Sequence, residues 1–323
     1  MADRDAILFL TPHFTENVWG GTRLHDVFGY DVTGSHIGEC WGISAHGHGS
    51  SLIRNGRFAG CTLREAVAED PRLFGLTTPE FPLLVKLIDA ADDLSIQVHP
   101  DDEYARIHEN GSPGKSECWY ILDALPGAEL VLGHRAKTRE ELKEKIERGE
   151  MAALFRTVPV FPGDLIRIPP GTVHAIKGGI LLLEIQQNSD ITYRVYDYDR
   201  LWQGKKRELH VEKSLDVIRV PAEDPGKLIT RKEEIERQET ENRLQVLMED
   251  PHFTLFRLRL KGRAELARDG GFTAATVIRG AGSVNGLSIR KGDHFILTDA
   301  CREVMFAGDA ELILSEAVLA QVY

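Results

Sequence analysis

Residues 164–187, DLIRIPPGTVHAIKGGILLLEIQQ, contain short β-prone runs separated by turns rich in proline and glycine. Pro169, Pro170 and Gly171 interrupt the first run, and two further glycines interrupt the second. The same rhythm continues on both sides, in ECWYILDA (117–124), AELVLGH (128–134) and ITYRVYDYD (191–199). Short strands joined by such turns are typical of antiparallel sandwiches and jelly rolls. The sequence therefore predicts a mainly β protein.

Helical segments interrupt this pattern at three places, and we predict them as insertions. They cover about 62–75, 101–110 and 138–156. The last is the clearest, because Thr138 followed by Glu141 matches a capping box and Leu142 and Ile146 follow the helical period.

A second β region follows a charged stretch at 222–245. FPGDLIRIPPGTVHAI (161–176) and IRKGDHFILTDACREV (289–304) share a Gly-Asp pair followed by an apolar strand. The second copy has no histidine at the position of His174. We predict a catalytic domain over 1–235 and a smaller jelly-roll-like domain over 236–323 without metal ligands.

Composition excludes several classes of function. The net charge of −11 over 323 residues argues against nucleic acid or an anionic membrane as a partner. No apolar run approaches the roughly 18 residues of a membrane span, and MADRDAILFL does not resemble a signal peptide. The four cysteines are far apart and form no CxxC pair, which fits a reducing compartment. We predict a cytoplasmic protein, and the composition predicts no oligomeric state.

Polar residues on one face of an otherwise apolar strand indicate a site. In LSIQVHP (94–100), Ser95, Gln97 and His99 occupy every second position and so share a face. The spacing from Gly163 through Pro169 and Gly171 to His174 resembles the second motif of the cupin superfamily, whose metal ligands lie on adjacent antiparallel strands.

A single histidine or glutamine in a strand is usually a hydrogen-bonded structural residue. The combination of Gln97, His99, Glu117 and His174 at inward-compatible spacings instead favours a metal site. Two imidazoles, a carboxylate and an amide suit zinc, and also manganese, cobalt or iron(II).

Several motifs together resemble the type I mannose-6-phosphate isomerase family in its short bacterial form. They are SIQVHP, GKSECWYIL, GTVHA and EIQQNSDITYRVYDYDR, with VWGG (18–21) and GECWGISAH (38–46) nearer the N-terminus. The resemblance implies a cupin β-sandwich that interconverts mannose 6-phosphate and fructose 6-phosphate through an enediol. It implies one zinc ion per chain, held by Gln97, His99, Glu117 and His174, and it places the family's active-site arginine at Arg194.

The reaction requires a proton-transfer group and cations for the phosphate of a small sugar phosphate. Lys115, Glu184 and Asp190 join Arg194 as catalytic candidates, with the base unassigned among them. The resemblance places Ser95 and Lys86 at the phosphate end, and Arg200 is a weaker phosphate candidate.

Two alternative functions deserve comparison with the isomerase. An iron(II) cupin dioxygenase would need an open apolar pocket, which Lys86, Lys115 and Arg194 argue against. A silent sugar-phosphate-binding or regulatory cupin would need no metal, so the ligand set argues against it. His46 and His48 in AHGHG look like a second metal pair, but their Gly- and Ser-rich surroundings favour loop histidines.

Overall fold

Two antiparallel sheets pack face to face in the computed structural model, which describes residues 5–318. The larger contains, in spatial order, β18 (Ile229–Thr230), β12 (Leu165–Ile168), β9 (Glu117–Ala124), β14 (Ile180–Gln187), β7 (Leu83–Ala90), β2 (His13–Gly21) and β3 (Ile37–Ile43). The smaller contains β11 (Phe155–Pro159), β10 (Glu129–His134), β13 (His174–Ile176), β8 (Ile96–Val98) and β15 (Tyr193–Tyr196). Apolar residues of both, such as Ile121, Leu182 and Leu132, form one buried cluster between them.

The segment 164–187 crosses between these sheets twice. β12 lies in the larger sheet, β13 in the smaller, and β14 returns to the larger beside β9 and β7. Gly171, in the first crossing, has φ +82°, a conformation that favours glycine, and its N–H donates to the carbonyl of His99. The predicted mainly β cupin sandwich is therefore confirmed.

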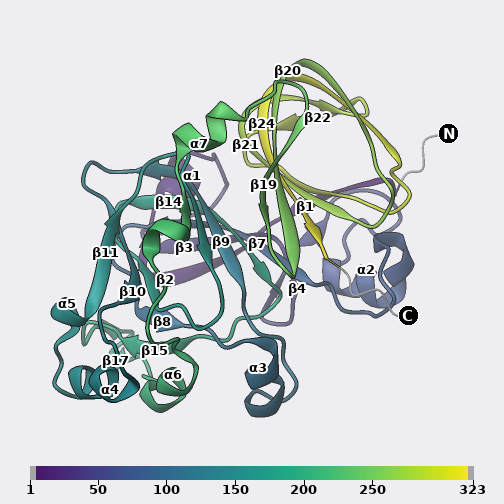
Figure 1. Cartoon of the computed structure of the whole chain (residues 1–323). Helices are drawn as coiled ribbons and strands as arrows, with labels where there is room; N and C mark the ends of the chain where they lie inside the picture. The colour runs from purple at the N-terminus through teal and green to yellow at the C-terminus, as the bar shows by residue number, and fades with distance from the viewer. Residues whose placement is uncertain (1–4, 319–323) are drawn as a thin grey trace.

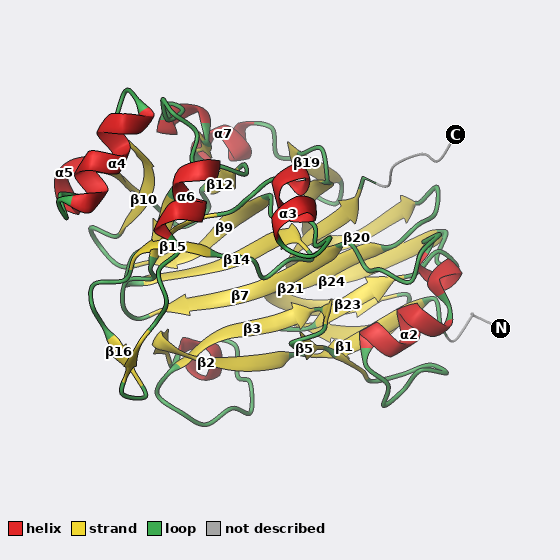
Figure 2. Cartoon of the chain, turned by 90° about the horizontal axis from the view of Figure 1, so that it is seen from below, coloured by secondary structure: helices red, strands yellow, loops and turns green. Residues whose placement is uncertain are grey.

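Helices cover the outer face of the smaller sheet. They are α4 (Arg139–Glu147), α5 (Met151–Leu154) and α6 (Val211–Val217), and they gather beside β10 and β15 (Figure 2). The range 138–156 contains two helices rather than one, because Gly149 adopts φ +70° between them. Thr138 Oγ1 accepts the N–H of Glu141, while the Glu141 carboxylate accepts from Lys137 instead of closing the box on Thr138.

The remaining helices are short. They are α1 (Arg23–Asp26), α2 (Leu63–Glu69), α3 (Asp102–His108) and α7 (Lys232–Arg237), with 3₁₀ helices at Pro71–Phe74 and Pro225–Lys227. The ranges 62–75 and 101–110 contain α2 with its 3₁₀ extension and α3. Within residues 5–318, no helix combines the length and apolar character needed to cross a membrane.

A third, eight-stranded sheet contains most of the C-terminal region (Figure 1). It comprises β19 (Leu244–Glu249), β20 (Phe253–Ala267), β24 (Glu303–Ala317), β21 (Thr273–Val284), β23 (His294–Leu297), β1 (Ile7–Thr11) and β6 (Leu52–Ile53), with β22 (Leu287–Arg290) paired to β21. Two hairpins lie outside the sheets: β4 (Ala45–His46) with β5 (Gly49–Ser50), and β16 (Leu201–Trp202) with β17 (Lys205–Lys206).

The N-terminal strand belongs to this C-terminal sheet. β1 pairs antiparallel with β23, with Ile7 opposite Leu297 and Leu10 opposite His294. A domain boundary at 235/236 would therefore divide the C-terminal sheet, because β1 lies before the boundary and the strand it pairs with, β23, lies after it. The division into domains 1–235 and 236–323 stays a prediction. A continuous apolar cluster, which includes Leu183 of β14 and Ile296 of β23, joins the C-terminal sheet to the larger sheet of the sandwich.

Candidate metal centre and active-site cavity

The polar face of LSIQVHP points away from the helical cover. Ile96 and Val98 are buried in the apolar cluster that includes Leu142 of α4, whereas Gln97 points to the opposite face. β8 pairs with β13, which places Gln97 opposite His174, and with β15, which places Gln97 opposite Arg194. Strand pairing thus brings together residues that lie far apart in the sequence.

Three buried side chains form a compact group of donor atoms. His99 follows β8, Glu117 begins β9 and His174 begins β13, and one donor atom from each lies within 4.8 Å of the others. His174 Nε2 lies 3.1 Å from Glu117 Oε1, and His99 Nε2 lies 3.4 Å from Oε2. Neither carboxylate oxygen has a well-aligned hydrogen-bond donor.

The tautomers of the two histidines are set by backbone carbonyls. His99 Nδ1 donates to the carbonyl of Ile191 at 2.8 Å, and His174 Nδ1 donates to that of Thr172 at 2.9 Å. Burial, together with the nearby Lys115, lowers the pKa of His99 to about 3, so its Nε2 carries a lone pair. Lone pairs therefore face carboxylate oxygens across the group, an arrangement that fits a bound cation.

Gln97 completes the group from the same side. Its amide Nε2 lies 3.4 Å from His174 Nε2, and its Oε1 accepts from Ser95 Oγ at 3.2 Å. Rotation of the amide by 180° presents Oε1 to the group and still leaves Ser95 a hydrogen-bond partner. The four residues therefore offer two imidazole nitrogens and two oxygens, a donor set that suits a divalent transition metal.

Lys115 places its ammonium beside this group. Its Nζ lies 2.8 Å from Glu117 Oε2 and 3.3 Å from His99 Nε2. Burial opposes the charge of Glu117, but the adjacent Lys115 ammonium is the largest opposing effect, and the pKa of Glu117 lies well below its usual range. The group therefore attracts positive charge even from the protein's own side chains.

A cavity of about 180 Å³ opens beside the metal-ligand group. Most of the predicted site residues line it: Lys86, Ser95, Gln97, Lys115, Glu184, Asp190 and Arg194. A larger cavity of about 530 Å³, lined in part by Arg257 and Glu311, contains none of them. The chemistry-bearing residues thus converge on the smaller, more polar cavity.

Lys86 lies between two buried carboxylates. Its Nζ is 3.5 Å from an oxygen of Glu39 and 3.5 Å from Glu184 Oε1, and it sits over the Trp41 ring. Burial lowers the pKa of Lys86, but the two carboxylates more than compensate and raise it. Lys86 therefore stays charged and is largely neutralised by its own neighbours.

Glu184 differs from Glu39 in how its oxygens are satisfied. Trp119 Nε1 donates to Glu184 Oε2 at 2.8 Å, while Oε1 has no hydrogen-bond donor. Burial and the nearby Glu117 carboxylate raise the pKa of Glu184. Glu184 is thus a buried carboxyl group at the cavity wall, with a raised pKa and one oxygen that accepts no hydrogen bond.

Two arginines meet at the other end of the cavity. Burial, with Arg207 close by, lowers the pKa of Arg194, and Arg194 Nε has no hydrogen-bond partner. Arg207 binds Asp197 through two nitrogens at 2.8 and 2.5 Å. Arg200 also binds Asp197 but does not line the cavity, so its phosphate role stays a prediction that this placement does not favour.

Sequence reasoning missed several residues of the cavity. Glu39, Trp41, Trp119 and Arg207 all line it. Glu39 and Trp41 lie in the GECWGISAH motif, whose alternating pattern could have indicated one face of a strand. Arg207 lies in a run of charged residues, and no local signal distinguishes it from its neighbours.

Comparison with known proteins gives consistent results along nearly the whole chain. Residues 7–161 match the family model for the phosphomannose isomerase type I catalytic domain, and 244–317 match the mannose-6-phosphate isomerase cupin domain. The chain is 47% identical to the mannose-6-phosphate isomerase ManA of Bacillus subtilis, covering 95% of this chain and 98% of that protein. It is 42% identical to the mannose-6-phosphate isomerase of Streptococcus mutans, with 96% and 98% covered.

Solved structures agree with the sequence comparison. The crystal structure of the mannose 6-phosphate isomerase from Bacillus subtilis superposes with a TM-score of 0.86 at 40% identity, covering 96% of this chain and 99% of that one. A mannose 6-phosphate isomerase solved with zinc and yttrium shares the fold, with a TM-score of 0.74 at 15% identity and 97% and 100% covered.

Proposed function

The chain belongs to the type I phosphomannose isomerase family and interconverts mannose 6-phosphate and fructose 6-phosphate, and we propose that Gln97, His99, Glu117 and His174 hold its metal ion. Enzymes of this family depend on a metal. The observation that carries the proposal is that the Nε2 atoms of His99 and His174, whose Nδ1 atoms donate to backbone carbonyls, converge on the buried Glu117 carboxylate, while the Lys115 ammonium lies beside only one of its oxygens, Oε2. A buried arrangement of this kind is costly without a cation.

Zinc is the metal that we propose, one ion per chain. Two imidazoles, a carboxylate and an amide oxygen match the ligand types of zinc, although manganese, cobalt and iron(II) use similar donors. The structural neighbour solved with zinc and yttrium supports this choice.

Glu184 is the proton-transfer group of the proposal. A divalent cation bound at the four ligands would polarise the substrate carbonyl. The Glu184 carboxylate removes a proton from the carbon next to the carbonyl and returns it to the former carbonyl carbon, while the hydroxyl proton of the neighbouring carbon moves to the former carbonyl oxygen, so that aldose becomes ketose through an enediol. Its Oε1, which accepts no hydrogen bond and has only the ion-pair contact with Lys86, its raised pKa and its place on the cavity wall suit that role.

Lys115 and Asp190 contact the sugar in this proposal. The Lys115 ammonium lies beside the metal-ligand group, where it stabilises negative charge that develops on the substrate oxygens. Asp190, at the cavity wall, accepts hydrogen bonds from sugar hydroxyl groups, and Ser95 lines the same cavity.

The phosphate lies between Arg194 and Arg207 in the proposal. The positive charge of Arg207 disfavours the charged form of Arg194, and an anion bound between the two guanidinium groups would relieve this repulsion. Lys86, already flanked by Glu39 and Glu184, contributes positive charge to the cavity without being a primary phosphate ligand. We place the enzyme in the cytoplasm, because its four cysteines are all free.

The test is to measure fructose 6-phosphate formation from mannose 6-phosphate before and after chelation, with zinc, manganese or cobalt added back separately. We expect activity to disappear with the metal and to return fully with stoichiometric zinc. Glu117→Gln should lose both metal and activity. Retention of activity in metal-free protein would overturn the metal proposal, and better recovery with another metal would overturn the choice of zinc.

A further inference from the structure

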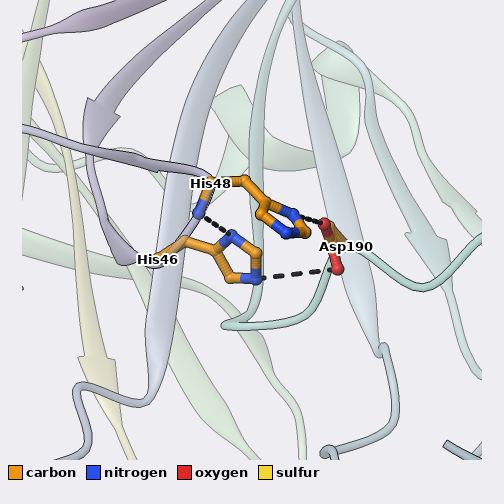
Figure 3. Close-up of side chains that lie close together, drawn as sticks. All are labelled: His46, His48 and Asp190. Carbon is orange, nitrogen blue, oxygen red and sulfur yellow. Dashed lines mark hydrogen bonds and ion pairs between the residues drawn. The ribbon is translucent and has the colours of Figure 1, made fainter.

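A second cluster of titratable side chains, His46, His48 and Asp190 (Figure 3), adjoins the same cavity through Asp190, which lines it. His46 and His48 come from the β4–β5 hairpin, and Asp190 comes from the loop between β14 and β15. His46 Nε2 lies 3.6 Å from Asp190 Oδ1, and His48 Nδ1 lies 2.5 Å from Asp190 Oδ2. Each oxygen of the carboxylate therefore faces its own imidazole nitrogen.

The hairpin itself fixes the tautomer of His46. The backbone N–H of His48 donates to His46 Nδ1 at 3.2 Å, so the proton of the neutral ring lies on Nε2 and points toward Asp190. His48 Nδ1 faces a carboxylate oxygen and must likewise donate. His48 thus donates an N–H to the carboxylate, and the Nε2–H of His46 faces its other oxygen at 3.6 Å, beyond hydrogen-bond distance.

The same hydrogen bond argues against a metal ion at this cluster. Ligation through His46 Nε2 would require the ring proton on Nδ1, where the N–H of His48 already donates. The contact between His48 and Asp190 is also shorter than the separation of two donor atoms around one zinc ion, which is about 3 Å for bonds of about 2 Å.

The hairpin is held rigidly enough to position a partner. Ser44 Oγ donates to the carbonyl of Gly49 at 2.5 Å and accepts the N–H of His46 at 3.1 Å. The His46 ring packs edge-on against Trp41, with ring centres 5.7 Å apart. His46 is mostly buried, whereas His48 is 75% exposed.

We propose that His46 and His48 are positioning residues that orient the Asp190 carboxylate toward the hydroxyl groups of the bound sugar. This inference rests on the proposed role of Asp190 in the active-site cavity. Among residues 5–318, the ion pairs of Asp190 are with these two histidines, so without them its side chain would rotate freely at the cavity wall.

The test compares kcat and KM for mannose 6-phosphate in matched variants. His48→Ala removes one donor, whereas His48→Asn keeps an N–H near the position of Nδ1. His46→Leu removes the other donor, and His46→Gln keeps an N–H near the position of Nε2. We expect KM to rise about three- to tenfold in both His48→Ala and His46→Leu, with kcat nearly unchanged, because each variant removes one of the two side chains that orient the Asp190 carboxylate. The two conservative variants should restore most of the affinity.

The effect of His48→Ala is also measured in a protein that already carries Asp190→Asn. If the histidines act through Asp190, His48→Ala should add nothing to the KM of Asp190→Asn. His25→Ala is the control, because His25 is an exposed histidine that contacts Asp26 away from the cavity.

Three outcomes would overturn the inference: wild-type kinetics in both His48→Ala and His46→Leu, an undiminished effect of His48→Ala in the Asp190→Asn background, or loss of one bound metal per chain in His48→Ala. A wild-type protein without isomerase activity would instead overturn the proposed function.

Discussion

Glu184 is the residue whose environment differs most from that of a surface acid. It is buried beside Trp119, Lys86 and Glu117, and its Oε1 faces the cavity without a hydrogen-bond donor. We expect Glu184→Gln to lower kcat by about 10²- to 10⁴-fold, because the amide keeps the shape of the side chain but cannot accept a proton. Steady-state kinetics with a measurement of bound metal would check this.

Glu39 offers the matched control for Glu184. It also flanks Lys86 and lines the cavity, but it accepts hydrogen bonds from Trp41 Nε1 and Thr15 Oγ1. Glu39→Gln should lower kcat far less than Glu184→Gln does. Equal losses in both variants would mean that the charge balance around Lys86, and not proton transfer, explains the effect.

Arg207 lines the cavity beside Arg194 and is a proposed phosphate ligand. Arg207→Ala removes a guanidinium from the cavity wall and should raise KM about 10- to 100-fold, with a smaller change in kcat. Arg200→Ala removes the other arginine bound to Asp197 and should raise KM less. A larger KM in Arg200→Ala than in Arg207→Ala would instead indicate that Arg200 binds the phosphate.

Residues of the site were predictable where a periodic pattern or a family motif identified them. Gln97 and His99 stood out because they alternate with Ile96 and Val98 on one strand. Arg207 was not predictable, since it reaches the cavity through its pairing with Asp197 and not through any local pattern. The Gly- and Ser-rich surroundings of His46 and His48 predict loop histidines, and no local pattern reveals their contact with Asp190, more than a hundred residues away in the sequence.

Helix α4 acts on the site from behind the smaller sheet. Leu142 is fully buried in the cluster that also contains Val98 and Ala175, the neighbours of Gln97 and His174. Leu142→Ala should lower the free energy of unfolding by about 2–5 kcal/mol through loss of buried surface and the resulting cavity. Urea unfolding of the metal-loaded protein would measure this.

Lys143 on the same helix is the control, since it is 60% exposed. Lys143→Ala should change stability by less than about 0.5 kcal/mol. Similar losses in both variants would show that the helix contributes through its own helical propensity and not through packing behind β8 and β13.

At the level of elements, the strands were easier to predict than the helices. ECWYILDA coincides with β9 over its full length because apolar residues and flanking turns define it. α6 escaped prediction because VEKSLDV follows a charged stretch and its N-cap, His210, makes no capping hydrogen bond that a sequence motif would reveal. The break between α4 and α5 depends on the backbone of Gly149, which the helical period alone does not reveal.

At the level of the whole molecule, His294 joins the C-terminal sheet to the sandwich. Its ring is fully buried, contacts Thr276 Oγ1 and Tyr30 Oη at 2.9 Å each, and packs against Gly42 of β3. Burial, with a smaller effect of Arg54, lowers the pKa of His294 to about 3. The folded protein therefore holds this imidazole neutral where an unfolded chain would protonate it.

This difference predicts a pH-dependent stability. Below the unfolded pKa of 6.5 the unfolded state binds a proton that the folded state excludes, so stability should fall as pH decreases from about 6.5 toward about 3. The contribution is up to about 1.4 kcal/mol per pH unit. His294→Gln, compared with wild type at equal zinc concentration, should show a shallower loss of stability over this window. Parallel stability curves for the two proteins would contradict the prediction.

The pairing of β1 with β23 has a consequence for synthesis of the protein on the ribosome. Residues 294–297, which pair with residues 7–11, are made about 280 residues after them. At translation rates of about 5–20 residues per second, one edge of the apolar strand ILFLT waits roughly 15 to 60 s for its partner. An unpaired apolar edge is a site of aggregation. We therefore expect the nascent chain, far more than the finished enzyme, to need a chaperone that covers β1.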